Sequence, residues 1–572
     1  MSDKLSVYKQ ANEIEAANRL WPLYGSGLEN LGDEGQTIDI GIPNYGPDEL
    51  LVRHDACGIC FSDIKVINAG EQHPRIFRDI KKEPVVLGHE VSMTVVGVGE
   101  NLRDRYQVGD RFIIQADIYD QGINWAYGYM YQGGMSQYNV IDHRILDGDH
   151  GNYLIPVQAE TGYAESALAE PWACVIAAYE LQYRTGLKEN GLTWIIGTGQ
   201  AGDDYFFGAG FDEAGSPARL ALTNVPDAVA ARLRAQAAQL GVEVFDISPE
   251  QLHEPEADLP TFDDIVILGA DPEAIEAASL RLADFGIVAI IATEPLPRPV
   301  QVDVGRIHYN RWTYVGGPGP DIARAYSAYP IPAELKAGGK AWFVGAGGPM
   351  GQMHVQRAVQ MADPPQLILC TDLFAERLQV LEDMLGAEAR AKGIDFVCLG
   401  VKDEGYEARL AELAGEGFDD IIILAPAAIV ATQSAEHLAS GGIMNIFAGL
   451  KRGTMATLDL SVVYLQNQRF IGHTASTIED LRLMLHQTET KQLSPNRSVA
   501  AIGSLDAALG GFEAVMGAEF PGKVVIFPQI RDFPLTSLPE LKEKLPTVYA
   551  KLKDGREWTV EAEEEFLRLM LP

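Results

Sequence analysis

The pattern of apolar positions repeats in the middle of the chain. From about residue 190 to 485, short apolar runs alternate with segments of helical periodicity such as 228–240 and 374–385. The run Phe262-Asp-Asp-Ile-Val-Ile-Leu268 matches Phe418-Asp-Asp-Ile-Ile-Ile-Leu424 at an offset of 156 residues. Strand-like runs that alternate with helices are typical of a parallel sheet covered by helices. The pattern therefore predicts two tandem doubly wound domains, at 190–325 and 335–485.

The first 185 residues show a different pattern. Short strand-like runs at 49–53, 90–97 and 110–114 are separated by Gly, Pro and Asp turns, which predicts a mainly β domain over 1–185. Residues 490–530 contain similar short runs and are expected to return to that domain. Helical periodicity with many charges predicts a C-terminal helical tail over 531–572. The fold class is thus α/β with a mainly β domain.

Charge and composition exclude several functions. The chain of 572 residues has 45 Lys and Arg against 80 Asp and Glu, a net charge of −35, which would repel nucleic acid and an anionic membrane surface. No apolar run approaches the roughly 18 residues that span a bilayer. Five scattered cysteines and the absence of an apolar leader at the N-terminus favour a reducing, cytoplasmic location. We expect neither nucleic acid nor membrane as a partner.

Three residues of the predicted β domain have side chains that suit a metal. Cys60 follows a strand-like run, His89 comes 29 residues later, and Glu170 opens a predicted helix. A thiolate, an imidazole and a carboxylate together are typical of a catalytic zinc site with one open position. Cys57 and Cys60 also form a C-x-x-C pair, which alone would fit a redox pair or half of a structural zinc site.

Four motifs, in order, give a family resemblance. Gly58-Ile-Cys60-Phe-Ser62-Asp63, Gly88-His89-Glu90, Gly109-Asp110-Arg111 and Glu170-Pro171 resemble the zinc-dependent medium-chain dehydrogenases, in the polyol (sorbitol dehydrogenase-like) branch. The resemblance covers most of the chain except the extra dinucleotide-type domain and the tail. It implies a GroES-like catalytic domain followed by Rossmann-type domains.

The resemblance also implies roles for individual residues. Cys60, His89 and Glu170 would bind one catalytic zinc, and Glu90 would exchange with them as a ligand. Ser62 would contact the substrate oxygen and relay its proton. Asp63 is either an acceptor for the His89 ring N–H or a turn residue.

Two departures from the family pattern matter. Residues 115–132 contain no cysteine, so we expect no structural zinc. Lys65 stands where family members commonly have the histidine that ends the proton relay. Lys65 either accepts protons with a lowered pKa or meets an anionic group of the substrate.

The second repeat is the predicted dinucleotide site. Its glycine turn lies between a strand and a helix, the architecture that holds a pyrophosphate, and the next strand ends in Asp372, which favours NAD(H) over NADP(H). The turn residues are Gly345, Gly347, Gly348, Pro349, Met350 and Gly351. The first repeat has a similar strand–turn–helix pattern, but Asp203 and Asp204 stand where a pyrophosphate would lie and would repel it.

These features predict an NAD- and zinc-dependent dehydrogenase or reductase of a polyol, sugar or sugar phosphate that interconverts a secondary alcohol and a ketone. The segment Gly128-Tyr-Met-Tyr-Gln-Gly-Gly134 is similar to that of sugar-phosphate reductases, and Arg53, Lys65 and Arg75 would then meet a phosphate. Two alternatives stay open. One is a redox-neutral epimerase or lyase with tightly bound NAD, and the other is a non-catalytic binding protein that kept the fold.

The degenerate first repeat has two interpretations. It replaces a partner subunit's dinucleotide domain by pairing edge strands, so that the chain is a monomer with an internal pseudo-dimer. Alternatively it packs elsewhere or lines the active-site cleft, and the chain forms a homo-oligomer.

Overall fold

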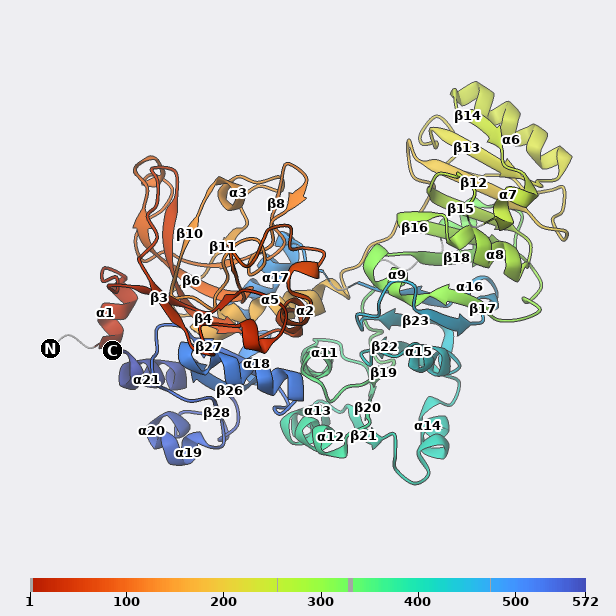
Figure 1. The fold of residues 1–572 in the computed structure, drawn as a ribbon. Coiled ribbons are helices and arrows are strands. Elements are labelled where there is room, and N and C mark those ends of the chain that lie inside the picture. Colours follow the sequence, from red (N-terminus) through yellow and green to blue (C-terminus); the bar gives the residue numbers. More distant parts are fainter. Residues whose placement is uncertain (1–3, 255, 328–332, 474) are drawn as a thin grey trace. The chain divides into compact units, whose positions relative to one another are not determined.

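A computed structural model describes residues 4–254, 256–327, 333–473 and 475–572. The chain divides into two compact units. Unit 1 contains Met1–Ile176 and Ser476–Pro572, and unit 2 contains Ala177–Ala475. Figure 1 shows both ends of the chain, red to orange and deep blue, within unit 1. Within the described residues, no helix is long and apolar enough to cross a membrane.

Unit 1 is built on an eight-stranded sheet. The strands follow the order β11-β7-β6-β4-β27-β26-β28, and β10 pairs with β4. The late strand β27 runs antiparallel to β4, with Val525 opposite Gly58 and Ile526 opposite Cys57, so a C-terminal segment lies beside the strand that leads into Cys60. The strands are β4 (Leu50–Gly58), β6 (Glu90–Val98), β7 (Arg111–Ile114), β10 (Tyr138–Ile141), β11 (Leu154–Pro156), β26 (Val499–Ser504), β27 (Lys523–Phe527) and β28 (Thr536–Ser537).

Short strands and helices cover this sheet. Three two-stranded pairs involve β1 (Asn18–Leu20) with β3 (Ile38–Ile40), β2 (Pro22–Leu23) with β5 (Val85–Val86), and β8 (Tyr119–Asp120) with β9 (Ile123–Asn124). The helices are α1 (Lys4–Gln10), α2 (Phe61–Ala69), α3 (His143–Leu146), α4 (Tyr163–Ala167), α5 (Ala169–Ala177), α17 (Ile478–Glu489), α18 (Ala508–Gly517), α19 (Leu541–Lys544), α20 (Pro546–Tyr549) and α21 (Val560–Met570). Apolar residues of α21 and its neighbours share a core with Tyr163, Ile502 and Phe527, so the tail is packed onto unit 1.

Unit 2 contains two parallel six-stranded sheets with the same strand order. The order, third-second-first-fourth-fifth-sixth, is that of the doubly wound dinucleotide-binding fold. The first sheet contains β14 (Glu243–Asp246), β13 (Arg219–Thr223), β12 (Leu192–Gly197), β15 (Phe262–Leu268), β16 (Leu282–Ile291) and β18 (Thr313–Gly317). The second contains β21 (Asp395–Gly400), β20 (Leu367–Asp372), β19 (Lys340–Val344), β22 (Phe418–Ile423), β23 (Leu438–Ile446) and β25 (Arg469–Ile471).

The helices of unit 2 differ between the repeats at one place. In the second repeat α11 follows β19, whereas residues 198–218, which join β12 to β13, contain no helix. The expected strand–turn–helix pattern is therefore wrong for the first repeat. The helices are α6 (Asp227–Leu240), α7 (Pro249–His253), α8 (Pro272–Ser279), α9 (Val304–Asn310), α10 (Ala323–Ser327), α11 (Pro349–Gln360), α12 (Ala375–Leu381), α13 (Ala387–Ala391), α14 (Tyr406–Ala414), α15 (Ala428–Ala435) and α16 (Ser461–Leu465).

The two repeats pack on each other through equivalent elements. Strand β17 (Val300–Asp303) pairs antiparallel with β24 (Met455–Leu458), so that Val300 faces Leu458 and Val302 faces Ala456. At the repeat offset of 156 residues, Gln301 faces its own equivalent, Thr457, and Val300 faces the equivalent of Val302, as across a two-fold axis. The edge strands β18 and β25 are also in contact, and β18 packs on α16 (Figure 1).

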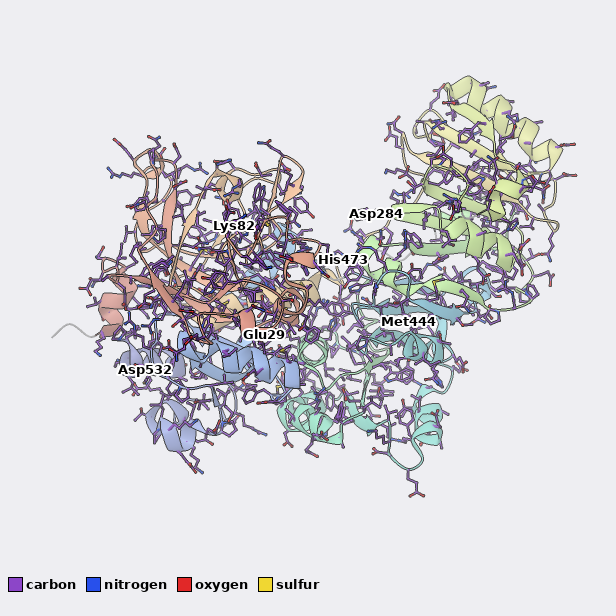
Figure 2. All side chains as sticks on the ribbon, in the orientation of Figure 1. Glu29, Lys82, Asp284, Met444, His473 and Asp532 are labelled. Carbon is purple, nitrogen blue, oxygen red and sulfur yellow. The ribbon has the colours of Figure 1, made fainter. Side chains whose placement is uncertain are left out.

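Two glycines confirm the internal symmetry. A side chain on Gly316 would collide with Tyr464, and one on Gly472 would collide with backbone atoms of His308. Both pairs are related by the same offset of 156 residues. One hydrophobic core runs through both repeats and includes Met444 of β23, labelled in Figure 2. The first repeat therefore packs on the second, in the arrangement of an internal pseudo-dimer.

Candidate active site

The strand-to-helix turn at the end of β4 places Cys60. Cys60 is the residue before α2, and its backbone N–H donates to Asp63 Oδ2 at 2.9 Å. A carboxylate at this position satisfies the free N–H groups of a helix start. Asp63 Oδ1 also accepts from the Gly88 N–H at 3.3 Å. The buried Asp63 thus ties the turn that contains Cys60 to the segment that contains His89.

Cys60, His89 and Glu90 converge. Their ligand atoms all lie within 4.8 Å of one another. The Ser62 hydroxyl lies 3.0 Å from Cys60 Sγ and 3.2 Å from His89 Nε2. Asp63 Oδ1 lies 3.3 Å from His89 Nδ1, although without hydrogen-bond geometry. The ring is held with its Nε2 toward the cysteine.

The chemistry of this group suits zinc. Glu90 is fully buried, and its Oε2 atom has no hydrogen-bond partner among the described residues. A buried carboxylate oxygen without a partner costs free energy unless a cation or a donor is supplied. A thiolate, an imidazole and a carboxylate oxygen are ligands that zinc takes in catalytic sites. The site residues therefore fit the ion.

Lys523 completes the charge balance of the site. Its ammonium lies 2.5 Å from Glu90 Oε1 and 2.8 Å from the Ile59 carbonyl, and both ion-pair partners are buried. Burial opposes the charged form of Lys523, but Glu90 outweighs it and raises the pKa. Lys523 therefore fixes one oxygen of Glu90 and leaves the other to the metal group. No motif spacing pointed to Lys523, because it lies on β27, 433 positions after Glu90 in the chain.

Glu170 does not join the converging group. It lies on α5, and its carboxylate is outside the set of ligand atoms that are mutually within 4.8 Å. The pKa of Glu170 is raised to about 7, mainly by burial; the charge of His89 lowers it, that of Glu90 raises it and that of Lys523 lowers it. Glu170 therefore interacts electrostatically with the site residues. The carboxylate that lies beside Cys60 and His89 is that of Glu90.

The glycine turn of the second repeat has the geometry of a phosphate cradle. Gly345 has a φ of +87°, and a side chain on Gly351 would come within 2.5 Å of the Ala346 carbonyl oxygen. Gly348 precedes α11, which begins with Pro349 and Met350 and runs for 12 residues. Backbone N–H groups at such a helix start bind a pyrophosphate.

Asp372 adjoins this turn. Its Oδ2 accepts from the Gly347 N–H at 2.9 Å, and a side chain on Gly347 would come within 2.6 Å of Arg377 Cβ. The turn thus requires glycine for steric reasons, and an acid stands where the ribose of a dinucleotide would be bound. These residues fit NAD.

The corresponding turn of the first repeat offers no such cradle. Gly202 is followed by Asp203 and Asp204 in an irregular segment, and no helix start lies there among the described residues. The Asp203 carbonyl accepts from the side chain of Arg232 on α6. The two carboxylates therefore lie on a surface loop.

Comparisons with known proteins agree with this geometry. Residues 46–146 match the model of the alcohol dehydrogenase GroES-like domain. Mannitol-1-phosphate 5-dehydrogenase of Aliivibrio fischeri is 26% identical over 305 residues, which is 49% of this chain and 70% of that protein. L-sorbose 1-phosphate reductase of Klebsiella pneumoniae is 29% identical over 173 residues, 28% of this chain and 41% of that protein.

The chain therefore contains an alcohol dehydrogenase GroES-like domain, and its relatives are named as dehydrogenases and reductases of polyols and sugar phosphates. The dehydrogenase also has the fold of 2R,3R-butanediol dehydrogenase from Bacillus subtilis, with a TM-score of 0.50 and 16% identity over 89% of this chain and 99% of that one. The predicted fold class, a GroES-like domain with two Rossmann-type domains, is confirmed, and so is the prediction of an enzyme.

Three basic residues predicted to meet a phosphate lie in different surroundings in the dehydrogenase. Lys65 is exposed on α2. Arg75 pairs with Asp117, with Nη1 2.6 Å from Oδ1. Arg53 is instead buried, 2.8 Å from Asp55 and stacked over the ring of Tyr8. Arg53 is therefore part of a buried ion pair, and the prediction that it meets a phosphate is wrong.

Proposed function

We propose that the dehydrogenase is zinc- and NAD-dependent and interconverts a secondary alcohol and a ketone in a polyol, sugar or sugar phosphate. The observation that carries this proposal is the convergence of Cys60, His89 and Glu90 around a buried oxygen without a partner. The names of two relatives, a mannitol-1-phosphate 5-dehydrogenase and an L-sorbose 1-phosphate reductase, support the substrate class.

Cys60, His89 and Glu90 would hold the metal. Zinc bound there supplies a Lewis acid that lowers the pKa of an alcohol oxygen. The Asp63 carboxylate, 3.3 Å from His89 Nδ1, would favour the ring orientation that leaves Nε2 free as a ligand. Lys523 pairs with Glu90 Oε1 and orients the carboxylate. Ser62, which contacts both Cys60 and His89, is placed to take the proton of the substrate hydroxyl.

The second repeat would hold the dinucleotide. Gly345, Gly347, Gly348 and Gly351 leave room for the pyrophosphate at the start of α11. Asp372 would accept the ribose hydroxyls and repel a 2′-phosphate, so NAD is favoured over NADP. NAD supplies the hydride acceptor.

We also propose that the dehydrogenase does not dimerise through the edge strand β25. Strand β18 of the first repeat already packs there, and β24 is already paired with β17. A second copy of the chain therefore finds no free edge at this position. Sedimentation velocity of the purified protein tests this, and a dimer that buries β25 against another copy would contradict it.

The zinc mechanism is tested by Cys60→Ala. We expect this variant to lose bound zinc, measured by mass spectrometry of the metal, and to lose at least about 100-fold in turnover, because one of three ligands and the charge of the thiolate are removed. NADH formation from polyols, ketoses and their phosphates gives the turnover. A net change of NADH also separates this function from a redox-neutral epimerase or lyase.

Cys57→Ala is the matched control. Cys57 lies three residues earlier, is fully buried and packs with its Sγ against Gly88 and Gly134. We expect Cys57→Ala to keep its zinc and most of its turnover. Retained zinc and turnover in Cys60→Ala would overturn the proposed function, and zinc loss in both variants would favour a C-x-x-C metal site.

A further inference from the structure

Basic side chains gather beside the metal group, around the ring of Tyr129. The Tyr129 ring centroid lies 6.0 Å from that of His89 and 5.5 Å from that of His73. The guanidinium carbon of Arg75 lies 5.6 Å from the same centroid. The His73 Nδ1 atom accepts from the backbone N–H of Arg75 at 3.3 Å. Tyr129 therefore lies beside both a metal ligand and two basic side chains.

Lys65 belongs to the same basic group. Partial burial lowers the pKa of His73, and the charges of Arg75 and Lys65 lower it further. Lys65 lies one turn of α2 beyond Phe61, next to the residues that hold Cys60. Both cations thus act on the ring of His73, in a chain whose net charge is −35.

Only part of this positive charge is neutralised. Asp117 accepts from Arg75 Nη1 at 2.6 Å and Nη2 at 3.5 Å, and it also accepts from the Asn124 amide at 3.3 Å. A guanidinium has five N–H donors, so this pairing leaves others free, and 42% of the Arg75 side chain is exposed. Among the described residues Lys65 has no ion-pair partner.

We propose that Lys65, His73 and Arg75 bind the phosphate of a phosphorylated polyol or ketose whose reacting carbon lies at Cys60, His89 and Glu90. This inference rests on the proposed function and narrows its substrate class. Arg and Lys are the side chains that bind phosphate most strongly, Arg in a planar fork and Lys as a point charge. Asp117 holds Arg75 in place.

The position of Tyr129 constrains the ligand. Its ring lies beside both the metal ligand His89 and the basic group. A substrate that reaches from one to the other would pass the ring, whose face offers an apolar contact to C–H groups. This placement suits a phosphate on a carbon other than the reacting one. It also assigns Lys65 to an anionic substrate group instead of to the exit of the proton relay.

The test compares matched substrates in the zinc- and NAD-loaded enzyme. The substrates are a hexitol 1-phosphate and the same hexitol, and a pentitol 1-phosphate and the same pentitol. For Lys65→Gln and Arg75→Gln we expect kcat/KM to fall about 10- to 100-fold for the phosphorylated member, since each variant removes a charge-assisted hydrogen bond. The unphosphorylated member should change less than about twofold.

Lys82→Gln is the matched control. Lys82, labelled in Figure 2, is an exposed lysine of unit 1 that pairs only with the neighbouring Asp79, and its variant should leave all four values unchanged. Lys65 is exposed, so Lys65→Gln leaves the fold intact even if Arg75→Gln, which unpairs Asp117, lowers stability.

Binding of inorganic phosphate gives a readout that does not depend on turnover. Isothermal titration of the zinc-loaded protein should show phosphate binding that weakens at least about tenfold in Lys65→Gln. An equal loss of kcat/KM for both members of each pair, or unchanged phosphate binding, would overturn the inference. If zinc-dependent oxidation of the hexitol has the same kcat/KM as that of its phosphate, this inference is wrong and the proposed function is unaffected. If none of the four substrates is turned over, the proposed function is wrong. Phosphate binding then still tests whether Lys65 belongs to an anion site.

Discussion

The two Rossmann-type repeats share a scaffold and differ at the turn that binds a nucleotide. Trp194 Nε1 donates to Thr223 Oγ1 at 2.8 Å, and Trp342 Nε1 donates to Thr371 Oγ1 at 2.9 Å. The same indole–hydroxyl bond thus ties the first two strands of each sheet. One residue further, the second repeat has Asp372 and the first has Asn224.

This comparison distinguishes the residues that pack the two repeats together from those that would bind a nucleotide. The core positions are kept in both repeats because each repeat is packed on the other, through β17 with β24 and β18 with β25. The turn after the first strand is kept only where a pyrophosphate would be bound. Asn224 instead donates its side-chain amide to the Gly197 carbonyl at 3.1 Å, and this bond closes the turn on itself. The first repeat therefore keeps the packing and lacks a helix start at this turn.

The largest effect is expected from breaking the contact between the repeats. Val302→Asp would place a charge at a position of β17 that is 1% exposed, without a cation for it in the β17–β24 ladder. We expect a loss of at least about 3 kcal/mol of unfolding free energy, since an unpaired buried charge is among the most destabilising changes. Chemical denaturation followed by circular dichroism measures this loss.

Gln301→Asp is the control for this prediction. Gln301 is the neighbouring residue of β17, but its side chain is exposed and donates to Thr457 Oγ1 at 2.8 Å. The Asp variant there should cost about 1 kcal/mol or less. Equal stability of Val302→Asp and Gln301→Asp would show that the repeats do not depend on each other.

The same comparison shows what a single sequence can predict. The repeat offset read from Phe262 and Phe418 predicted both sheets, because buried parallel strands leave near-continuous apolar runs. The family resemblance predicted Cys60 and His89 as neighbours, and the fold brings them together because Cys60 follows β4 and His89 precedes the adjacent antiparallel strand β6. The absence of a helix after Gly202 was not predictable, because the glycines of this segment have the spacing of a dinucleotide-binding turn. Lys523 beside Glu90 depends on a strand pairing that brings together residues 433 positions apart.

A smaller effect, on binding instead of stability, is expected at the glycine turns. Gly351→Ala would push Cβ to 2.5 Å from the Ala346 carbonyl oxygen, a backbone atom that cannot yield without moving the turn. We expect the Kd for NAD to rise about 100-fold, close to 2.7 kcal/mol. The matched variant is Gly202→Ala, whose Cβ meets only the end of the Asp204 side chain and should change the Kd less than twofold. Quenching of tryptophan fluorescence by NAD measures the Kd of both variants. Equal effects of Gly351→Ala and Gly202→Ala would contradict the assignment of the dinucleotide to the second repeat.

The smallest effect is expected from exchanging the residues that end the second strand of each sheet. Asp372→Asn removes the carboxylate that accepts from Gly347 and would accept from the ribose, and it also removes the charge that repels a 2′-phosphate. The Kd for NAD should rise about tenfold, or 1.4 kcal/mol, while the Kd for NADP falls, so the preference for NAD over NADP becomes smaller.

The reciprocal variant Asn224→Asp places an acid in the first repeat but does not create a helix start, because residues 198–218 contain no helix. It should create no second binding event in a titration with NAD. A stoichiometry of two for Asn224→Asp would mean that an acid alone distinguishes the repeats, and that the lost helix is incidental.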